Sequence, residues 1–293
     1  MPEPGLSVVI PAFNAAATLG ATVDSAFAAA ADEVIVVDDG SMDATTEIAR
    51  RHGARVLFQQ NSGASAARQA GLRAASGTYV VLLDADDELV PGGVRESIKV
   101  LDEAPDVVAA GGDVRGVWPD GSERPWPSKY GEISLDVIMR SGFGPWPPGG
   151  AVIRRSVLVT EGERLPPQLH TRYAEDFELF IRLSLAGMLV RHSAVALKYR
   201  MYGGKSTTAA RGVLDCKQRI RRYYGAWLGI PDHSLSRRGV RCQELLYRAR
   251  HAQVSGAPVS AAGFLARAIT VDPAQFMQSG WLFVRTHLAG GSP

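Results

Sequence analysis

The sequence contains few of the features that mark secreted or membrane-spanning proteins. It has two cysteines in 293 residues, Cys216 and Cys242, so a framework of structural disulfides is excluded and a reducing compartment is favoured. No apolar run reaches the roughly 18 residues that a membrane-spanning helix needs. The segment 1–5 contains no basic residue, unlike the start of a secretory signal peptide. These absences predict a cytoplasmic protein.

Net charge is also low, at +2 for the whole chain, but its distribution is uneven. Residues 211–293 contain 12 Lys and Arg against 4 Asp and Glu, which leaves 20 basic and 26 acidic side chains in residues 1–210. An acidic first part and a basic second part predict two regions with different roles. No nucleic-acid-binding motif accompanies the basic region, so nucleic acid is not an expected partner.

The first hundred residues alternate between short β-branched runs and Ala-rich stretches. The predicted buried strands cover 6–10, 33–38, 55–59 and 79–84, and the predicted helices cover 18–30, 44–52, 65–75 and 91–103. Strands and helices in this alternation predict an α/β fold, with a mostly parallel sheet flanked by helices on both faces. Gly53 and Gly77 stand where glycine is expected to end a helix.

The rest of the chain is irregular before it becomes helical. Residues 119–122 (Pro-Asp-Gly-Ser) predict a hairpin turn, and the Pro- and Gly-rich segment 142–150 excludes regular structure. The later predicted elements are a strand over 151–154, a helix over 175–186, a pair of strands over 189–201, and helices from 213 broken at Pro231, 256–258 and 272–273. We therefore predict one domain over 1–210 and an Arg-rich helical region over 211–293.

Acidic residues follow two of the predicted strands. Asp38 and Asp39 end the second strand, and the segment 84–88 (Asp-Ala-Asp-Asp-Glu) follows the fourth. Ligand sites of parallel sheets lie beyond the carboxyl ends of the strands. Clustered carboxylates raise one another's pKa unless a cation binds among them, and hard oxygen ligands favour Mg²⁺ or Mn²⁺. The alternative is that these carboxylates are solvated loop residues or helix caps.

Five segments in this order and spacing resemble the family-2 glycosyltransferases. They are 9–14 (Val-Ile-Pro-Ala-Phe-Asn), 36–41 (Val-Val-Asp-Asp-Gly-Ser), 61–68 (Asn-Ser-Gly-Ala-Ser-Ala-Ala-Arg), 84–87 (Asp-Ala-Asp-Asp) and 175–183, which begins Glu-Asp-Phe-Glu-Leu. The resemblance covers about residues 6–208. It implies the GT-A fold, with a Rossmann-like nucleotide-sugar-binding half over 1–111 and an acceptor-binding half over 112–210. It also implies a reaction that inverts the anomeric centre.

The resemblance further implies roles for single residues. The nucleoside would be held by Pro11, Asn14, Asp38 and Asp39, and the diphosphate by Arg68. Asp84 would contact the ribose or the metal, and Asp86 would bind the metal, with Asp87 as an alternative ligand. Asp176 would act as the general base that removes the acceptor proton. The guanidinium of an arginine suits phosphate oxygens, although a surface helix arginine is the plainer interpretation of Arg68. Glu175 and Asp176 have a similar alternative, because acidic residues in the first turn of a helix complement its dipole.

The acceptor side of the predicted site has fewer signals. Trp146 would stack on a sugar face, unless it packs in the core, and Glu175 would lie in the same pocket. Gly149 and Gly150 leave room for the donor sugar to approach the backbone. Many family members have a histidine where this chain has Tyr202, so Lys205 is expected to supply positive charge to the diphosphate instead.

Together these patterns predict an inverting glycosyltransferase that uses Mn²⁺ or Mg²⁺. Its donor would be a nucleotide sugar, with a UDP-sugar favoured by the resemblance, and its acceptor a saccharide, a lipid-linked sugar or a small molecule. A catalytically silent nucleotide-sugar-binding protein remains an alternative, and a sugar-nucleotide nucleotidyltransferase is disfavoured because 11–14 contains no Gly-rich basic loop. The arginines after residue 210 would meet an anionic acceptor or membrane lipid headgroups, or else form a solvated helical face.

Overall fold

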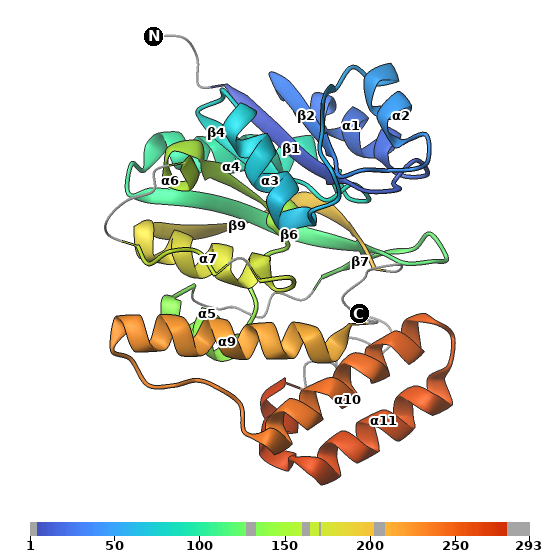
Figure 1. The fold of residues 1–293 in the computed structure, drawn as a ribbon, viewed down its shortest axis with the longest axis vertical. Helices are drawn as coiled ribbons and strands as arrows, with labels where there is room; N and C mark the ends of the chain where they lie inside the picture. Colours follow the sequence, from blue (N-terminus) through green and yellow to red (C-terminus); the bar gives the residue numbers. More distant parts are fainter. Residues whose placement is uncertain (1–4, 127–132, 160–164, 170, 202–208, 280–293) are drawn as a thin grey trace. The chain divides into compact units, whose positions relative to one another are not determined.

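The structure is a computed structural model that describes residues 5–126, 133–159, 165–169, 171–201 and 209–279 (Figure 1). The chain divides into two compact units. The first comprises Met1–Val117, Glu123–Ile138 and Phe143–Arg200, and the second comprises Trp118–Ser122, Met139–Gly142 and Met201–Pro293.

A mixed β-sheet forms the centre of the first unit. Its strands are β1 (Leu6–Ala12), β2 (Glu33–Asp38), β3 (Arg55–Phe58), β4 (Tyr79–Leu82), β5 (Glu88–Leu89), β6 (Val107–Val117), β7 (Glu123–Pro125), β8 (Ala151–Arg154) and β9 (Met188–Arg200). Their order is β3-β2-β1-β4-β8-β6-β9-β5, with β7 paired to β6. Strands β3, β2, β1 and β4 are parallel, whereas β8 runs antiparallel to both β4 and β6. The predicted α/β fold is confirmed.

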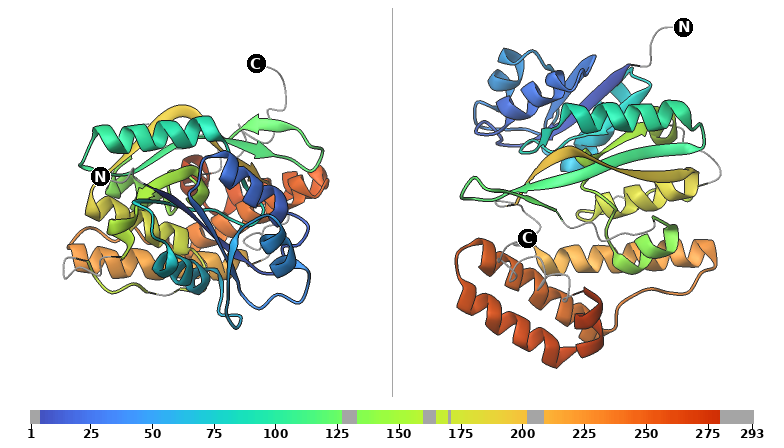
Figure 2. Two further views of the ribbon diagram at one scale, coloured as in Figure 1. Left: turned by 90° about the horizontal axis from the view of Figure 1, so that it is seen from above. Right: turned by 180° about the vertical axis from the view of Figure 1, so that it is seen from behind.

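Helices cover both faces of this sheet (Figure 2). The helices of the first unit are α1 (Leu19–Ala28), α2 (Thr45–Arg51), α3 (Ala64–Ala74), α4 (Pro91–Glu103), α6 (Arg155–Val159) and α7 (Glu175–Ala186). Residues of α5 (Leu135–Ser141) are divided between the two units. Val8 of β1 lies in one core cluster with Leu19 of α1 and Val94 of α4. Val9, which points to the opposite face, lies against Gly71 of α3. Because residues on both faces of β1 are buried, the strand is apolar except at Ser7.

Two glycines predicted to end helices have different roles. Gly53 follows α2 with a φ of 86°, the left-handed conformation that glycine adopts readily after a helix. The prediction for Gly77 was wrong, because α3 already ends at Ala74. A Cβ at Gly77 would come within 2.6 Å of Ser7 Oγ and 2.7 Å of the Gly5 carbonyl oxygen. This glycine is therefore needed for the close approach of two chain segments.

The predicted bounds of α4 and α7 are confirmed, and so is the hairpin between β6 and β7. The predicted pair of strands over 189–201 was wrong, since this segment forms the single strand β9. The polar residues His192 and Ser193 interrupt the apolar pattern and resemble a turn. In the structure β9 pairs with β6 through this region, and register shifts near Gly111 and Asp113 absorb the irregularity.

The described part of the second unit is mainly helical. It contains α9 (Ala210–Leu228), α10 (Arg237–Val254) and α11 (Pro258–Val271). Cys242 and Leu245 of α10 pack with Leu265 of α11 in a separate core cluster. The predicted breaks at Pro231 and at 256–258 are confirmed, and Gly256 has a φ of 75°. Within the described ranges, no helix is long and apolar enough to cross a bilayer.

Candidate functional site

The loops after β1, β2 and β4 lie side by side at one edge of the sheet. Ala12 at the end of β1 pairs with Asp38 at the end of β2. The backbone N–H of Asp39 donates to the Ala12 carbonyl oxygen over 2.8 Å, and the N–H of Leu83 donates to the Val9 carbonyl oxygen over 2.9 Å. The parallel register therefore brings the predicted site residues of three loops together.

Asn14 connects the first two of these loops. Its backbone N–H donates to Ser41 Oγ over 2.9 Å, and its Oδ1 accepts from the N–H of Met42 over 2.9 Å. Asn14 has a φ of 50°, a left-handed conformation that asparagine tolerates better than most residues. The side chain thus holds the loop after β1 against the loop after β2, and Pro11 lies in β1 just before the first of these loops.

The carboxylates of Asp38 and Asp39 are buried, with 1% and 4% of each residue exposed. Asp38 accepts from the backbone N–H of Ser41 over 2.8 Å and from the Thr46 hydroxyl. Asp39 Oδ1 accepts from Gln59 Nε2 over 2.7 Å. The remaining contacts of Asp39 are with the backbone N–H groups of Ser62 and Gly63, each over 2.8 Å. These two aspartates therefore shape the surrounding loops and are not solvated.

The acidic turn after β4 is closed by a hydrogen bond from the N–H of Asp87 to the Asp84 carbonyl oxygen over 3.1 Å. Burial, and then the charge of Asp84, raise the pKa of Asp86. The same two causes raise the pKa of Asp87 well above its usual value. Asp87 is 2% exposed, and its Oδ1 accepts from the N–H of Arg200 over 2.9 Å. Its buried Oδ2 has no hydrogen-bond partner among the described residues.

This turn fits a divalent cation that is shared with a phosphate ligand. Among the residues that the structure describes, no three His, Cys, Asp or Glu side chains converge as a self-contained metal site. However, Mg²⁺ is usually held by one or two carboxylates together with water and substrate phosphates. The unpartnered Oδ2 of Asp87 and the raised pKa of Asp86 are both features that a nearby cation would relieve.

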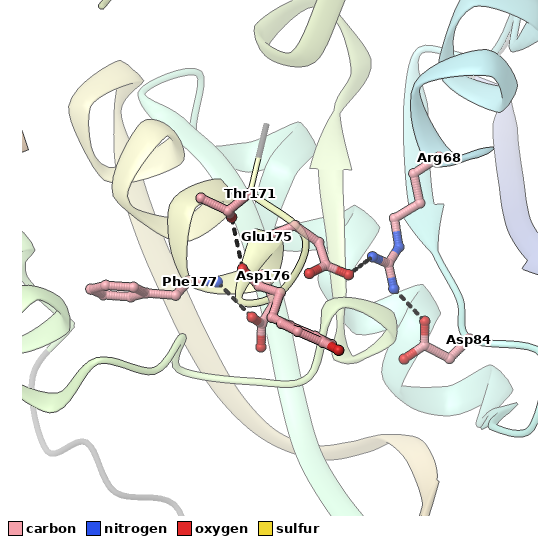
Figure 3. A network of polar contacts seen from close by, with 7 residues as sticks. Arg68, Asp84, Thr171, Glu175, Asp176 and Phe177 are labelled. Atoms are coloured by element: carbon pink, nitrogen blue, oxygen red, sulfur yellow. Dashed lines mark hydrogen bonds and ion pairs between the residues drawn. The ribbon is translucent and has the colours of Figure 1, made fainter. Parts of the chain in front are cut away.

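Arg68 lies between this turn and the start of α7 (Figure 3). Its Nη2 donates to Asp84 Oδ1 over 2.5 Å, and its Nη1 donates to Glu175 Oε1 over 2.9 Å. The side chain is 11% exposed, compared with 34% for Asp84 and 24% for Glu175. Burial alone would lower the pKa of Arg68, but the charges of Asp84 and Glu175 raise it. Arg68 is thus a partly buried ion-pair residue, which argues against the alternative of a solvated surface arginine.

Asp176 follows Glu175 in the first turn of α7 (Figure 3). The carboxylate is half-buried, and its Oδ1 accepts from the backbone N–H of Phe177 over 2.8 Å. This contact satisfies one of the free N–H groups at the helix start, as expected of an acidic residue there. The ion pair between Glu175 and Arg68 brings this turn of α7 to the strand ends that carry the acidic turn.

Three of the residues predicted to line the sugar pocket, Trp146, Gly149 and Gly150, are buried. Trp146 is 5% exposed, and its ring centroid lies 6.0 Å from that of Phe180. A Cβ at Gly149 would come within 2.9 Å of Leu83 Cδ1, and one at Gly150 would come within 3.0 Å of Trp146 Cβ. The space beside both glycines is therefore filled by the protein's own side chains, which favours the alternative that Trp146 packs in the core. Tyr202 and Lys205 lie outside the described residues.

Comparison with known proteins identifies the family. The sequence model of glycosyl transferase family 2 matches residues 7–160. The chain belongs to this family. A relative from Mycobacterium tuberculosis, an uncharacterized glycosyltransferase, is 30% identical over 208 residues that cover 69% of this chain and 88% of the relative. The undecaprenyl-phosphate 4-deoxy-4-formamido-L-arabinose transferase of Pseudomonas syringae is 34% identical over 149 residues, covering 47% of this chain and 43% of that enzyme.

Solved structures show that this family-2 glycosyltransferase has the GT-A fold. The structure of Staphylococcus aureus TarS 1–349 in complex with UDP-GlcNAc has a TM-score of 0.60 at 18% identity, and the match covers 94% of this chain and 84% of TarS. The Mycobacterium tuberculosis glucosyl-3-phosphoglycerate synthase in complex with Mn²⁺, UDP and glucosyl-3-phosphoglycerate has a TM-score of 0.52 at 21% identity. That match covers 78% of this chain and 82% of the synthase.

Two features of this glycosyltransferase site were missed by sequence reasoning. One is the pairing of Arg68 with carboxylates, where a diphosphate had been expected. The other is Arg200, whose backbone N–H holds Asp87 and whose Nε donates to the Asp86 carbonyl oxygen over 3.4 Å. Its position at the end of a predicted strand was the available signal, since strand ends carry the ligand site in such sheets.

Proposed function

We propose that this family-2 glycosyltransferase moves the sugar of a UDP-sugar to an acceptor hydroxyl with inversion of the anomeric centre. The observation that carries the proposal is the contact of Arg68 with both Asp84 and Glu175, which brings the acidic turn and Asp176 to one end of the sheet. The fold is shared with proteins crystallised with UDP-GlcNAc or UDP, which supports uridine as the donor base.

The chain's own residues have distinct parts in this reaction. The ends of β1 and β2 and the loops after them, with Pro11, Asn14, Asp38 and Asp39, would hold the nucleoside. Lys205 would add positive charge to the diphosphate. Asp176 would take the proton of the acceptor hydroxyl while the oxygen of that hydroxyl bonds to the anomeric carbon. The bond from that carbon to the diphosphate breaks on the opposite face, and the diphosphate leaves with the electron pair. General-base assistance of this kind contributes about 10²- to 10⁴-fold to the rate.

Asp86, with Asp87 beside it, would hold Mn²⁺ or Mg²⁺. The bound cation would neutralise charge that develops on the leaving diphosphate. The unpartnered Oδ2 of Asp87 supports this assignment, as does the presence of Mn²⁺ and UDP in glucosyl-3-phosphoglycerate synthase.

Calorimetric titration of UDP, GDP and dTDP, each with and without Mn²⁺, tests the donor and the metal together. We expect metal-dependent binding of UDP that is lost in Asp86→Ala and kept in Asp106→Ala, which removes an exposed aspartate from the loop before β6. Binding that needs no metal, or that survives Asp86→Ala, would contradict the metal assignment. In the same preparation, Asp176→Asn should keep UDP affinity while turnover falls by about 10²- to 10⁴-fold.

The acceptor is proposed to be lipid-linked. Two relatives are named as transferases to undecaprenyl phosphate and to cholesterol, although each alignment covers less than half of the relative. The second unit also exposes apolar side chains, with Val259 85%, Met277 63% and Ile269 45% exposed, as a surface that contacts lipid would. Sedimentation with anionic vesicles should capture the wild-type protein but not the Val259→Ser, Ile269→Ser double variant. Equal capture of both would contradict membrane contact through α11.

A further inference from the structure

We infer that Arg68 is a positioning residue that joins the acidic turn Asp84–Asp87 to the start of α7, in place of the diphosphate contact that the family resemblance implies. The consequence for turnover rests on the proposed function, because it assumes that Asp176 acts as the base. The positioning role itself does not rest on the proposed function, since it concerns the protein without any ligand.

The geometry of the guanidinium supports this role. Both of its terminal nitrogens already donate to carboxylates, at 2.5 Å to Asp84 and 2.9 Å to Glu175. Its Nε is buried without a hydrogen-bond partner among the described residues. An arginine has five N–H donors in a rigid planar fork, which suits two fixed carboxylates better than a single ammonium does. The two carboxylates thus fix the plane of the guanidinium and engage one N–H of each terminal nitrogen.

The sequence positions of the partners explain what the contact achieves. Asp84 lies 16 residues from Arg68 and follows β4, whereas Glu175 lies 107 residues away and begins α7. The residue before α7 is Ala174, which has a φ of 64° and no side chain that could cap the helix. A first turn without such a cap gains order from a contact with a neighbouring element. Arg68 supplies that contact one residue before Asp176.

Charge balance points the same way. Asp84, Asp86 and Asp87 place three carboxylates in one turn, and Glu175 adds a further carboxylate at the start of α7. Arg68 is the described cation that contacts both Asp84 and Glu175. Without it, two partly buried carboxylates would repel each other across the gap between the turn and α7, and the two segments would separate.

Hydrogen exchange of the full-length protein without ligands tests the positioning directly. In Arg68→Gln and in Glu175→Gln, we expect faster amide exchange at 174–178 than in the wild type, and in Arg68→Gln also at 84–87. The double variant should exchange at 174–178 no faster than the single variants, because the same contact is lost in each. Arg73→Gln, an exposed arginine on the same helix, is the control. Wild-type exchange at 174–178 in Arg68→Gln would overturn the inference.

Titration of UDP with Mn²⁺ then separates positioning from diphosphate binding. We expect Arg68→Gln and Glu175→Gln to keep the wild-type Kd for UDP, while kcat falls by about 10- to 100-fold because Asp176 is misplaced. Arg68→Lys should not restore kcat, since one ammonium cannot span both carboxylates. A rise in Kd of about 10- to 100-fold in Arg68→Gln alone, the effect of a lost charge-assisted hydrogen bond to phosphate, would overturn the inference. If the wild-type protein binds no nucleotide, the proposed function fails, and the exchange data still decide the positioning role.

Discussion

Two adjacent glycines in α4 provide a sharp test of how the helix lies on the sheet. A Cβ at Gly93 would stand 2.2 Å from the Val195 carbonyl oxygen and 2.4 Å from Ala196 Cα, both backbone atoms of β9. A Cβ at Gly92 would meet nothing within 4 Å. The substitutions Gly93→Ala and Gly92→Ala therefore add the same methyl group to the same helix, but only one of them meets another element.

The expected changes in the free energy of unfolding have opposite signs. Gly92→Ala should stabilise the protein by up to about 1 kcal/mol, because alanine loses less backbone entropy than glycine in a helix. Gly93→Ala should destabilise it by about 1–3 kcal/mol, the usual cost of overpacking, because backbone atoms cannot move aside by changing rotamer. β9 ends at Arg200, which holds Asp87, so a displaced β9 should also weaken metal-dependent nucleotide binding.

Urea denaturation followed by tryptophan fluorescence and by circular dichroism measures both changes. The two variants should have midpoints on opposite sides of the wild-type midpoint. Equal midpoints would refute the close approach of α4 to β9. A destabilised Gly92→Ala would instead show that the open space beside that residue is wrongly placed.

Two further predictions concern buried ionisable groups. The folded-state pKa of Asp87 is raised above its unfolded value, so the stability that this group contributes at low pH is lost as pH rises through the folded pKa. Asp87→Asn keeps an acceptor for the N–H of Arg200 and should raise the free energy of unfolding at neutral pH in metal-free buffer. The decrease in that free energy between acid and neutral pH, measured by urea titration, should be smaller than in the wild type. An unchanged pH dependence would contradict this. Arg221 is 3% exposed and donates to the carbonyl oxygens of Met139 and Arg140, so Arg221→Met should destabilise the second unit by about 1–3 kcal/mol, measured as faster exchange in α9 than in an Arg222→Met control.

Sequence patterns predicted the elements whose signals are local. The bounds of α4 were predictable because Pro91 suits the first helical position and cannot lie deeper in a helix. The segment that forms β9 was predicted as a pair of strands, and the polar residues His192 and Ser193 lie within it. Its pairing with β6 through register shifts, which no local pattern records, keeps it extended.

Some residues of the candidate site could likewise be predicted from the sequence, and others could not. The acidic turn after β4 and the aspartates after β2 were found from the sequence, because parallel strands place their carboxyl ends at one edge of a sheet. Trp146, Gly149 and Gly150 were assigned to a sugar pocket or to the core from an irregular Pro- and Gly-rich segment, and the structure buries all three. An aromatic residue beside glycines suits either a sugar or a core, and only the positions of Phe180 and the neighbouring strands decide between them.

The sequence by itself determined most of the strands and helices, the acidic strand ends and the family, because each of these is signalled by short segments of neighbouring residues. Only the tertiary structure decided which groups Arg68 contacts. Its partners lie 16 and 107 residues away, and a guanidinium binds carboxylates and phosphates through the same donors. The choice between them is therefore made by which group the fold brings within hydrogen-bonding distance.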